Sequence, residues 1–168
     1  MRTPVGILKA WLRTRGFGVH SPFAYRFIRE VLFQPFAYYA YGEIESSIRR
    51  DAENDMKRLY RILLYFRPEK IFVEDTDNDL KLIKNLVVND IGGKGNVRVN
   101  LAEVVSGERE SISNDADVYV LYGSVGKLFP VLKKKFDARG NGMLFYGKRM
   151  AVGVADARLP RQDFSLPI

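Results

Sequence analysis

The sequence predicts an α/β protein in which a helical leader precedes a mainly parallel sheet with helices on both faces. Apolar residues recur at helical spacing in residues 1–66, and short apolar strands alternate with helical segments in residues 67–168. Parallel strands joined by crossover helices are buried on both faces, because helices pack on each side of the sheet. We therefore expect residues 1–66 to form a leader packed on a sheet domain of residues 67–168, as one structural unit.

The composition is that of a globular chain and excludes several kinds of site. Of the 168 residues, 46% are hydrophobic and 28% are charged. The chain has no cysteine and a single histidine, which excludes disulfides, cysteine-ligated metals and multi-histidine metal sites. No apolar run reaches the length of a membrane span, and Arg13 and Arg15 interrupt the apolar segment near the start. We expect a soluble, cytoplasmic protein without a signal peptide.

The leader is predicted to contain several helices. Apolar spacing predicts a first helix over residues 4–14. Ser21 followed by Pro22 predicts the start of a second helix, because serine is a good N-cap and proline is tolerated at the first helical position. Asp51 is expected to cap a third helix, which ends at Arg67 before a proline.

The sheet domain is predicted from its apolar runs. Strands are expected at 71–73, 97–105, 117–122 and 143–146, with an edge strand over 163–166. Helices are expected around residues 80–87 and from near residue 127 to residue 139, because Pro130 belongs in a first turn. The stretch between the last two strands alternates only weakly, and we predict no strand in it. This order of elements is typical of a Rossmann-like fold.

Four segments carry a resemblance to a known family. They are RGFGVHSPF at residues 15–23, YYAY at residues 38–41, the helix end YFRP at residues 65–68 and RQDFSL at residues 161–166. The first holds the leader motif, which consists of Gly16, Gly18, His20, Ser21 and Pro22. Together they resemble a bacterial subgroup of class I S-adenosylmethionine-dependent methyltransferases. The resemblance implies a class I methyltransferase-like sheet and S-adenosylmethionine as the cofactor.

The expected cofactor turn departs from this resemblance. The family follows its first strand with an acidic residue and a glycine-rich turn, because glycines let the backbone approach the cofactor. Here Glu74 supplies the acid, but the turn contains Asp75 and Asp77 and no glycine. The span to Asp117 is also one strand–helix unit too short for the family. If the cofactor is bound, the resemblance implies that Glu74, Asp75 and Asp77 face it and that Glu103 replaces the acid of the missing unit.

The aspartates after the first predicted strand have other readings. Asp75, Asp77 and Asp79 alternate as they do in divalent-cation loops and in some phosphatase loops. Capping of the next helix by Asp77 or Asp79 accounts for the same carboxylates, and this is the reading that we adopt. The turn from Gly123 to Lys127 lacks the spacing of a phosphate-binding loop, so we expect a glycine turn that enters a helix.

The leader itself offers two kinds of surface. Its bases carry six of the seven net positive charges within residues 1–29. The candidate anion or nucleic-acid contacts are Arg13, Arg15, Arg26 and Arg29. We expect Tyr38, Tyr39 and Tyr41 to take part in packing the leader against the sheet domain, although stacking on nucleobases together with Arg26 and Arg29 is the alternative. His20 is expected to orient the leader by a hydrogen bond.

The sequence favours a degenerate methyltransferase-like protein that lacks catalytic activity and bound cofactor and acts in binding or assembly. One alternative is an active S-adenosylmethionine-dependent methyltransferase of unknown acceptor. Another is a nucleic-acid-binding module that uses the basic leader. Strand edges left open by the missing unit predict a homodimer or a partner protein, because an uncovered edge invites pairing.

Overall fold

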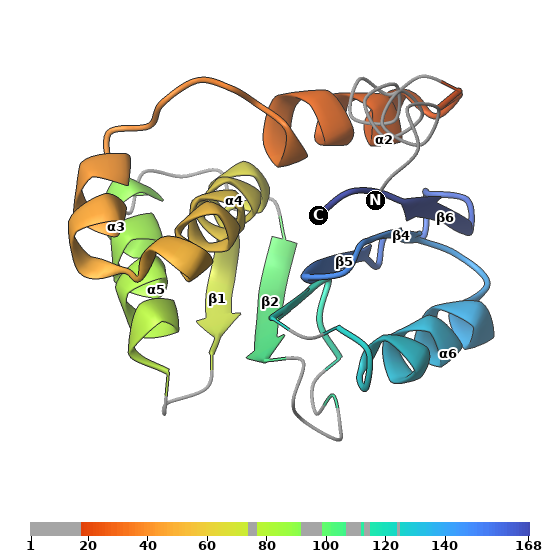
Figure 1. Cartoon of the computed structure of the whole chain (residues 1–168). Helices are drawn as coiled ribbons and strands as arrows, with labels where there is room; N and C mark the ends of the chain where they lie inside the picture. The colour runs from red at the N-terminus through yellow and green to blue at the C-terminus, as the bar shows by residue number, and fades with distance from the viewer. Residues whose placement is uncertain (1–17, 74–76, 92–98, 107–111, 113–114, 124) are drawn as a thin grey trace, which may run out of the picture.

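The chain runs from a helical leader into a six-stranded sheet (Figure 1). A computed structural model describes residues 18–73, 77–91, 99–106, 112, 115–123 and 125–168. Its elements, in chain order, are α2 (Pro22–Arg26), the π-helix η1 (Phe27–Leu32), α3 (Tyr41–Ser47), α4 (Arg50–Phe66), β1 (Pro68–Phe72), α5 (Asn78–Ile91), β2 (Val99–Ser106), β3 (Val118–Tyr122), α6 (Phe129–Arg139), β4 (Met143–Tyr146), β5 (Met150–Val154) and β6 (Gln162–Ser165). The helix predicted over residues 4–14 lies outside the described residues.

The start of α2 is formed as its sequence predicts. The side chain of Ser21 accepts a hydrogen bond of 3.3 Å from the N–H of Ala24, and Pro22 occupies the first turn. The helix continues into η1, whose last carbonyls are capped by α4. Arg61 donates from Nε to the carbonyl of Val31 at 2.6 Å and from Nη2 to that of Leu32 at 3.0 Å. These charged donors satisfy carbonyls that a helix end leaves without partners.

The predicted cap of the third helix is wrong. Arg49 is the N-cap residue of α4, and its side chain makes no capping hydrogen bond. Asp51 lies inside the first turn, where its negative charge is favourable near the positive end of the helix dipole. The sequence places an acid correctly near the helix start but not at the cap. The helix ends as predicted, because Arg67 turns into the left-handed region with φ 44° directly before Pro68.

The sheet is mixed but mostly parallel. Its strand order is β1-β2-β3-β5-β4-β6, with β1, β2 and β3 parallel to one another and β4 parallel to β6. Strand β5 runs antiparallel to both of its neighbours, with Val154 opposite Val118 on one side and opposite Met143 on the other. The mainly parallel sheet was predicted, but β5 was not. The predicted edge strand is confirmed as β6.

Side-chain alternation along β3 shows that helices cover both faces of the sheet. Val118 and Val120 belong to a core that includes residues of η1, α4 and α5. Tyr119 and Leu121 belong to a second core, which includes residues of α6. Since neighbouring residues of a strand point to opposite faces, α6 covers one face and the other helices cover the opposite one.

The leader is part of the first core. Phe27 is fully buried, with its ring centroid 4.9 Å from that of Phe145 in β4 and 5.4 Å from that of Phe66 in α4. The aromatic residues that were expected to pack against the sheet are Tyr38, Tyr39 and Tyr41, and none of them makes the contact that Phe27 makes. Tyr38 and Tyr41 instead contact α4, whereas Tyr39 is exposed.

Candidate functional site

Asp77 caps the helix that follows β1. Its Oδ1 accepts a hydrogen bond of 3.1 Å from the N–H of Leu80, in the first turn of α5. Its Oδ2 accepts a hydrogen bond from the hydroxyl of Tyr122, the last residue of β3. The predicted capped helix is confirmed, and the same carboxylate joins α5 to the end of β3. Within the described ranges, no group of three or more histidine, cysteine or acidic side chains is placed to hold a metal ion.

The other predicted cofactor-facing residues are only partly described. Glu74 and Asp75 lie outside the described residues. Asp79 lies in the first turn of α5, and burial, together with the nearby charge of Asp77, raises the pKa of its carboxyl. Of the acids predicted around this turn, the structure therefore brings Asp77 and Asp79 together.

Glu103 is fully buried in the middle of β2. It pairs with Phe72 of β1 on one side and with Tyr119 of β3 on the other. Its neighbours Ala102 and Val104 belong to the core shared with α4, so Glu103 points to the opposite face, the side of α6. Its role as the acid that replaces the one of the missing unit stays a prediction.

The basic leader is exposed where it is described. Arg26 and Arg29 lie on the surface of α2 and η1. Arg29 donates from Nη1 to the hydroxyl of Tyr25 at 2.8 Å, and its guanidinium carbon lies 5.6 Å from the centroid of that ring. Arg13 and Arg15 lie outside the described residues, so the proposed nucleic-acid contact stays a prediction.

The leader motif shapes the entry to α2. Gly18 has φ 79°, a left-handed conformation that glycine adopts without strain, and Ser21 and Pro22 open the helix. His20 is exposed, and no hydrogen bond joins it to any residue that the structure describes, so the expected anchoring bond is not found. Gly16 lies outside the described residues.

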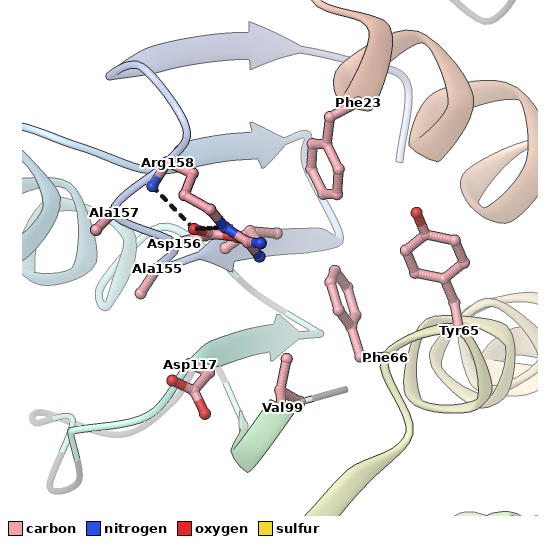
Figure 2. Close-up of a pocket in the computed structure, with 10 residues that line it drawn as sticks. Phe23, Tyr65, Phe66, Val99, Asp117, Ala155, Asp156, Ala157 and Arg158 are labelled. Carbon is pink, nitrogen blue, oxygen red and sulfur yellow. Dashed lines mark hydrogen bonds and ion pairs between the residues drawn. The ribbon is translucent and has the colours of Figure 1, made fainter. Parts of the chain in front are cut away.

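A cavity of about 420 Å³ lies at the opposite end of the parallel strands from Asp77 (Figure 2). It opens beside the first residue of β2, the residue before β3 and the last residue of β5. Asp77, in contrast, follows the last residue of β1. The helices α2 and α4 form its other side. The residues that line it are Phe23, Tyr65, Phe66, Val99, Asp117, Val154, Ala155, Asp156, Ala157 and Arg158.

One wall of this cavity is aromatic. Phe23 comes from α2, and Tyr65 and Phe66 come from the last turn of α4. The rings of Tyr65 and Phe66 meet edge to face, with centroids 5.1 Å apart. The buried side chains of Val154 and Ala155 add an aliphatic surface.

The polar groups of the cavity are an ion pair and a further carboxylate. Arg158 binds Asp156 through Nη2 at 2.7 Å and through Nε at 3.0 Å, and its backbone N–H donates to the same carboxylate at 2.9 Å. This pairing lowers the pKa of Asp156. Asp117 accepts a hydrogen bond of 3.1 Å at Oδ2 from the N–H of Leu101. The side chain of Arg158 is 88% exposed and stands at the mouth of the cavity.

Sequence reasoning did not find this cavity. Its lining comes from the leader, from the starts of two strands and from the segment after β5, so no single stretch of sequence contains it. The aromatic residues of the leader were expected to pack or to stack on nucleobases, not to line a cavity for a small molecule. Asp156 and Arg158 follow the strand that was not predicted, and they match no motif.

Strands β1 and β6 form the two outer edges of the described sheet, but a homodimer through them stays a prediction. Within the part of the chain that the structure describes, no helix has the length and apolar character needed to cross a membrane. No family model, curated protein or solved structure matches this chain, so the resemblance to methyltransferases rests on the sequence motifs alone.

Proposed function

We propose that this chain is a shortened class I methyltransferase-like protein with a Rossmann-like sheet, which acts by binding and does not transfer methyl groups. The observation that carries the proposal is the double engagement of the Asp77 carboxylate by the N–H of Leu80 and the hydroxyl of Tyr122. A carboxylate that holds the turn and the strand end together has a structural use, so its presence needs no ligand to explain it.

The helix start after β1 supports this reading. In Rossmann-like sites, the first N–H groups of that helix point toward the ligand, and their partial positive charge attracts its anionic part. Here Asp77 supplies an anion from the chain itself, at the N–H of Leu80. A ligand carboxylate or phosphate at this position would displace the cap and meet a like charge. The turn also lacks the glycines that let a cofactor approach the backbone.

The order of the strands supports it further. In a doubly wound sheet the ligand crevice lies at the carboxyl ends of the strands, where the strand order reverses on either side of the first strand. Among the described strands, β1 is the outermost, and β2 and β3 follow it in one direction. The described sheet therefore lacks the second half that would complete such a crevice beside β1. This gap fits the strand–helix unit that is missing from the sequence.

The proposal is tested by isothermal titration of the purified chain with S-adenosylmethionine and S-adenosylhomocysteine up to millimolar concentration. An active S-adenosylmethionine-dependent methyltransferase serves as the positive control. We expect binding heat from the control and none from this chain. Micromolar binding that Asp77→Ala changes would overturn the proposal, because it would place the cofactor at the capped turn.

A further inference from the structure

We propose that the cavity between α2, α4 and the end of β5 binds a flat aromatic molecule that carries a carboxylate or a comparable anionic group. The inference rests on the binding role proposed above and gives it a location and a ligand class. The cavity lies away from the capped turn at Asp77, so the ligand is not a cofactor in the methyltransferase position.

The size and the wall of the cavity fit an aromatic ring system. A volume of about 420 Å³ lies within the range of pockets that bind small molecules. Aromatic ligands gain from offset or edge-to-face contacts with aromatic side chains, and Phe23, Tyr65 and Phe66 offer such contacts from two helices.

The aromatic wall is held rigidly from behind. Phe23 stacks on Phe27, with ring centroids 5.9 Å apart and nearly parallel planes. Phe27 is itself fully buried against Phe66 and against Phe145 of the sheet. A wall that is already ordered loses little conformational entropy when a ligand binds, which favours affinity.

The sign of the ligand charge follows from Arg158. Figure 2 shows its guanidinium directed toward the space in front of Phe23 and Phe66. Asp156 engages Nε and Nη2, whereas Nη1 has no hydrogen-bond partner among the described residues. Guanidinium groups bind carboxylates strongly because the hydrogen bonds are charge-assisted. Because the carboxylates of Asp117 and Asp156 also line the cavity, the preference for an anion rests on this free donor and not on the net charge of the lining.

The two acids of the cavity do not reverse this choice. Asp156 already accepts from the side chain and from the backbone N–H of Arg158. Asp117 accepts from the backbone of Leu101 and so contributes to the fold. Arg158 is therefore the charged group of the lining that offers an unused donor to a ligand.

Three probes separate the contributions of shape and charge. They are 2-naphthoate, which is flat and anionic, 2-naphthylmethylamine, which is flat and cationic, and cyclohexanecarboxylate, which is anionic but not aromatic. Each is titrated into the full chain up to millimolar concentration, and binding is followed by calorimetry. We expect saturable binding of 2-naphthoate. The other two probes are expected to bind with affinities lower by a factor of about ten or more.

Matched variants place the binding in the cavity. Arg158→Gln removes the guanidinium and Phe23→Leu removes a flat ring while keeping an apolar side chain. Each is expected to weaken 2-naphthoate roughly tenfold. Arg50→Gln, which removes an exposed guanidinium from the start of α4, is expected to leave the affinity unchanged. Because Arg158 is exposed, Arg158→Gln is expected to fold normally, and thermal unfolding of all three variants checks this.

Three results would overturn the inference: no saturable binding of 2-naphthoate, equal or tighter binding of the amine, or the same affinity in Arg158→Gln as in Arg50→Gln. Failure of the proposed function is a separate result, since it is seen as binding of S-adenosylmethionine. If both ligands bind, a competition titration shows whether they share a site; the inference expects that they do not.

Discussion

The carboxylate of Asp55 in α4 accepts a hydrogen bond of 2.6 Å from Nε of Arg149, in the turn between β4 and β5. Nη2 of the same arginine donates to the carbonyl of Asp51 at 2.9 Å. The side chain of Asp55 is only 8% exposed, and its other charged partner is Arg58 at 3.4 Å. This contact ties the longest helix of the leader to the last hairpin of the sheet.

Removing Arg149 is expected to destabilise the fold. In Arg149→Ala, the buried carboxylate of Asp55 keeps only the longer contact with Arg58, so we expect a loss of about 2 kcal/mol in the free energy of unfolding. Urea unfolding measures it. Arg158→Ala is the matched control, because its ion pair is exposed and is worth less than about 1 kcal/mol. Equal losses in the two variants would contradict the prediction.

The cap of α5 makes a second prediction. Asp77→Ala removes the acceptor of the Leu80 N–H and of the Tyr122 hydroxyl, so we expect a loss of about 1–2 kcal/mol. Asp51→Ala is the control, because Asp51 lies in the first turn of α4 without capping it. We expect it to lower the free energy of unfolding by roughly a few tenths of a kcal/mol. Chemical denaturation of both variants and of wild type gives the comparison. A larger loss of stability from Asp51→Ala than from Asp77→Ala would contradict the prediction that Asp77 is the capping acid.

A double-mutant cycle extends this test. Tyr122→Phe removes the hydroxyl that donates to Asp77. The effects of Asp77→Ala and Tyr122→Phe are expected to be non-additive by about 0.5 kcal/mol or more, because the two residues share one hydrogen bond. Additive losses would mean that the bond between α5 and β3 contributes nothing to stability.

The turn between β4 and β5 requires glycine at position 147. A Cβ on Gly147 would overlap the carbonyl oxygen of Ile168 and would lie 2.6 Å from that of Leu166. Backbone atoms cannot rotate away as side chains do, so we expect Gly147→Ala to lower the stability by about 3 kcal/mol or more. Gly126→Ala, where no atom lies within 4 Å of the added Cβ, is expected to change stability by less than about 0.5 kcal/mol. Thermal unfolding of the two variants measures both effects. A Gly147→Ala variant as stable as wild type would contradict the close contact.

The ion pair of the cavity gives a pH dependence with a definite sign. Arg158 lowers the pKa of Asp156, so the folded state favours the ionised carboxylate. The resulting stability is fully present above pH of about 4, where the unfolded carboxyl is also ionised, and is lost as the pH falls through the folded pKa. Relative to Asp156→Asn, wild type is expected to be more stable by roughly 0.5 kcal/mol at neutral pH, and this advantage shrinks in acid. Denaturation at several pH values tests it, and an advantage that grows in acid would contradict it.

The elements that sequence reasoning predicted are those whose signals are local. Ser21 and Pro22 start α2, and Pro130 lies in the first turn of α6, because caps and proline act within one helical turn. Strand β5 was missed because Met150–Val154 is apolar on both faces and contains Gly153, which weakens a strand signal. A continuous apolar run is a signal of a fully buried strand, and it was present.

The candidate site was predictable only in part. The capping role of Asp77 follows from an aspartate just before a helix, which is a local pattern. Its bond to Tyr122 depends on the strand order β1-β2-β3, which no local signal sets. The cavity depends still more on tertiary structure, because Phe23 and Arg158 meet only after the leader has packed on the sheet.

Strand β5, which lies inside the sheet, comes later in the chain than both of the strands that flank it. Strands β3 and β4 both precede β5 in sequence, yet neither touches the other across the sheet until residues 150–154 lie between them. Val152, for example, pairs with Val120 on one side and with Phe145 on the other. Folding of the whole sheet therefore waits for long-range pairing, which slows it. In the folded chain, the amide protons of β5 point alternately to β3 and to β4 and are hydrogen-bonded there. We expect them to exchange with solvent only when the entire domain opens.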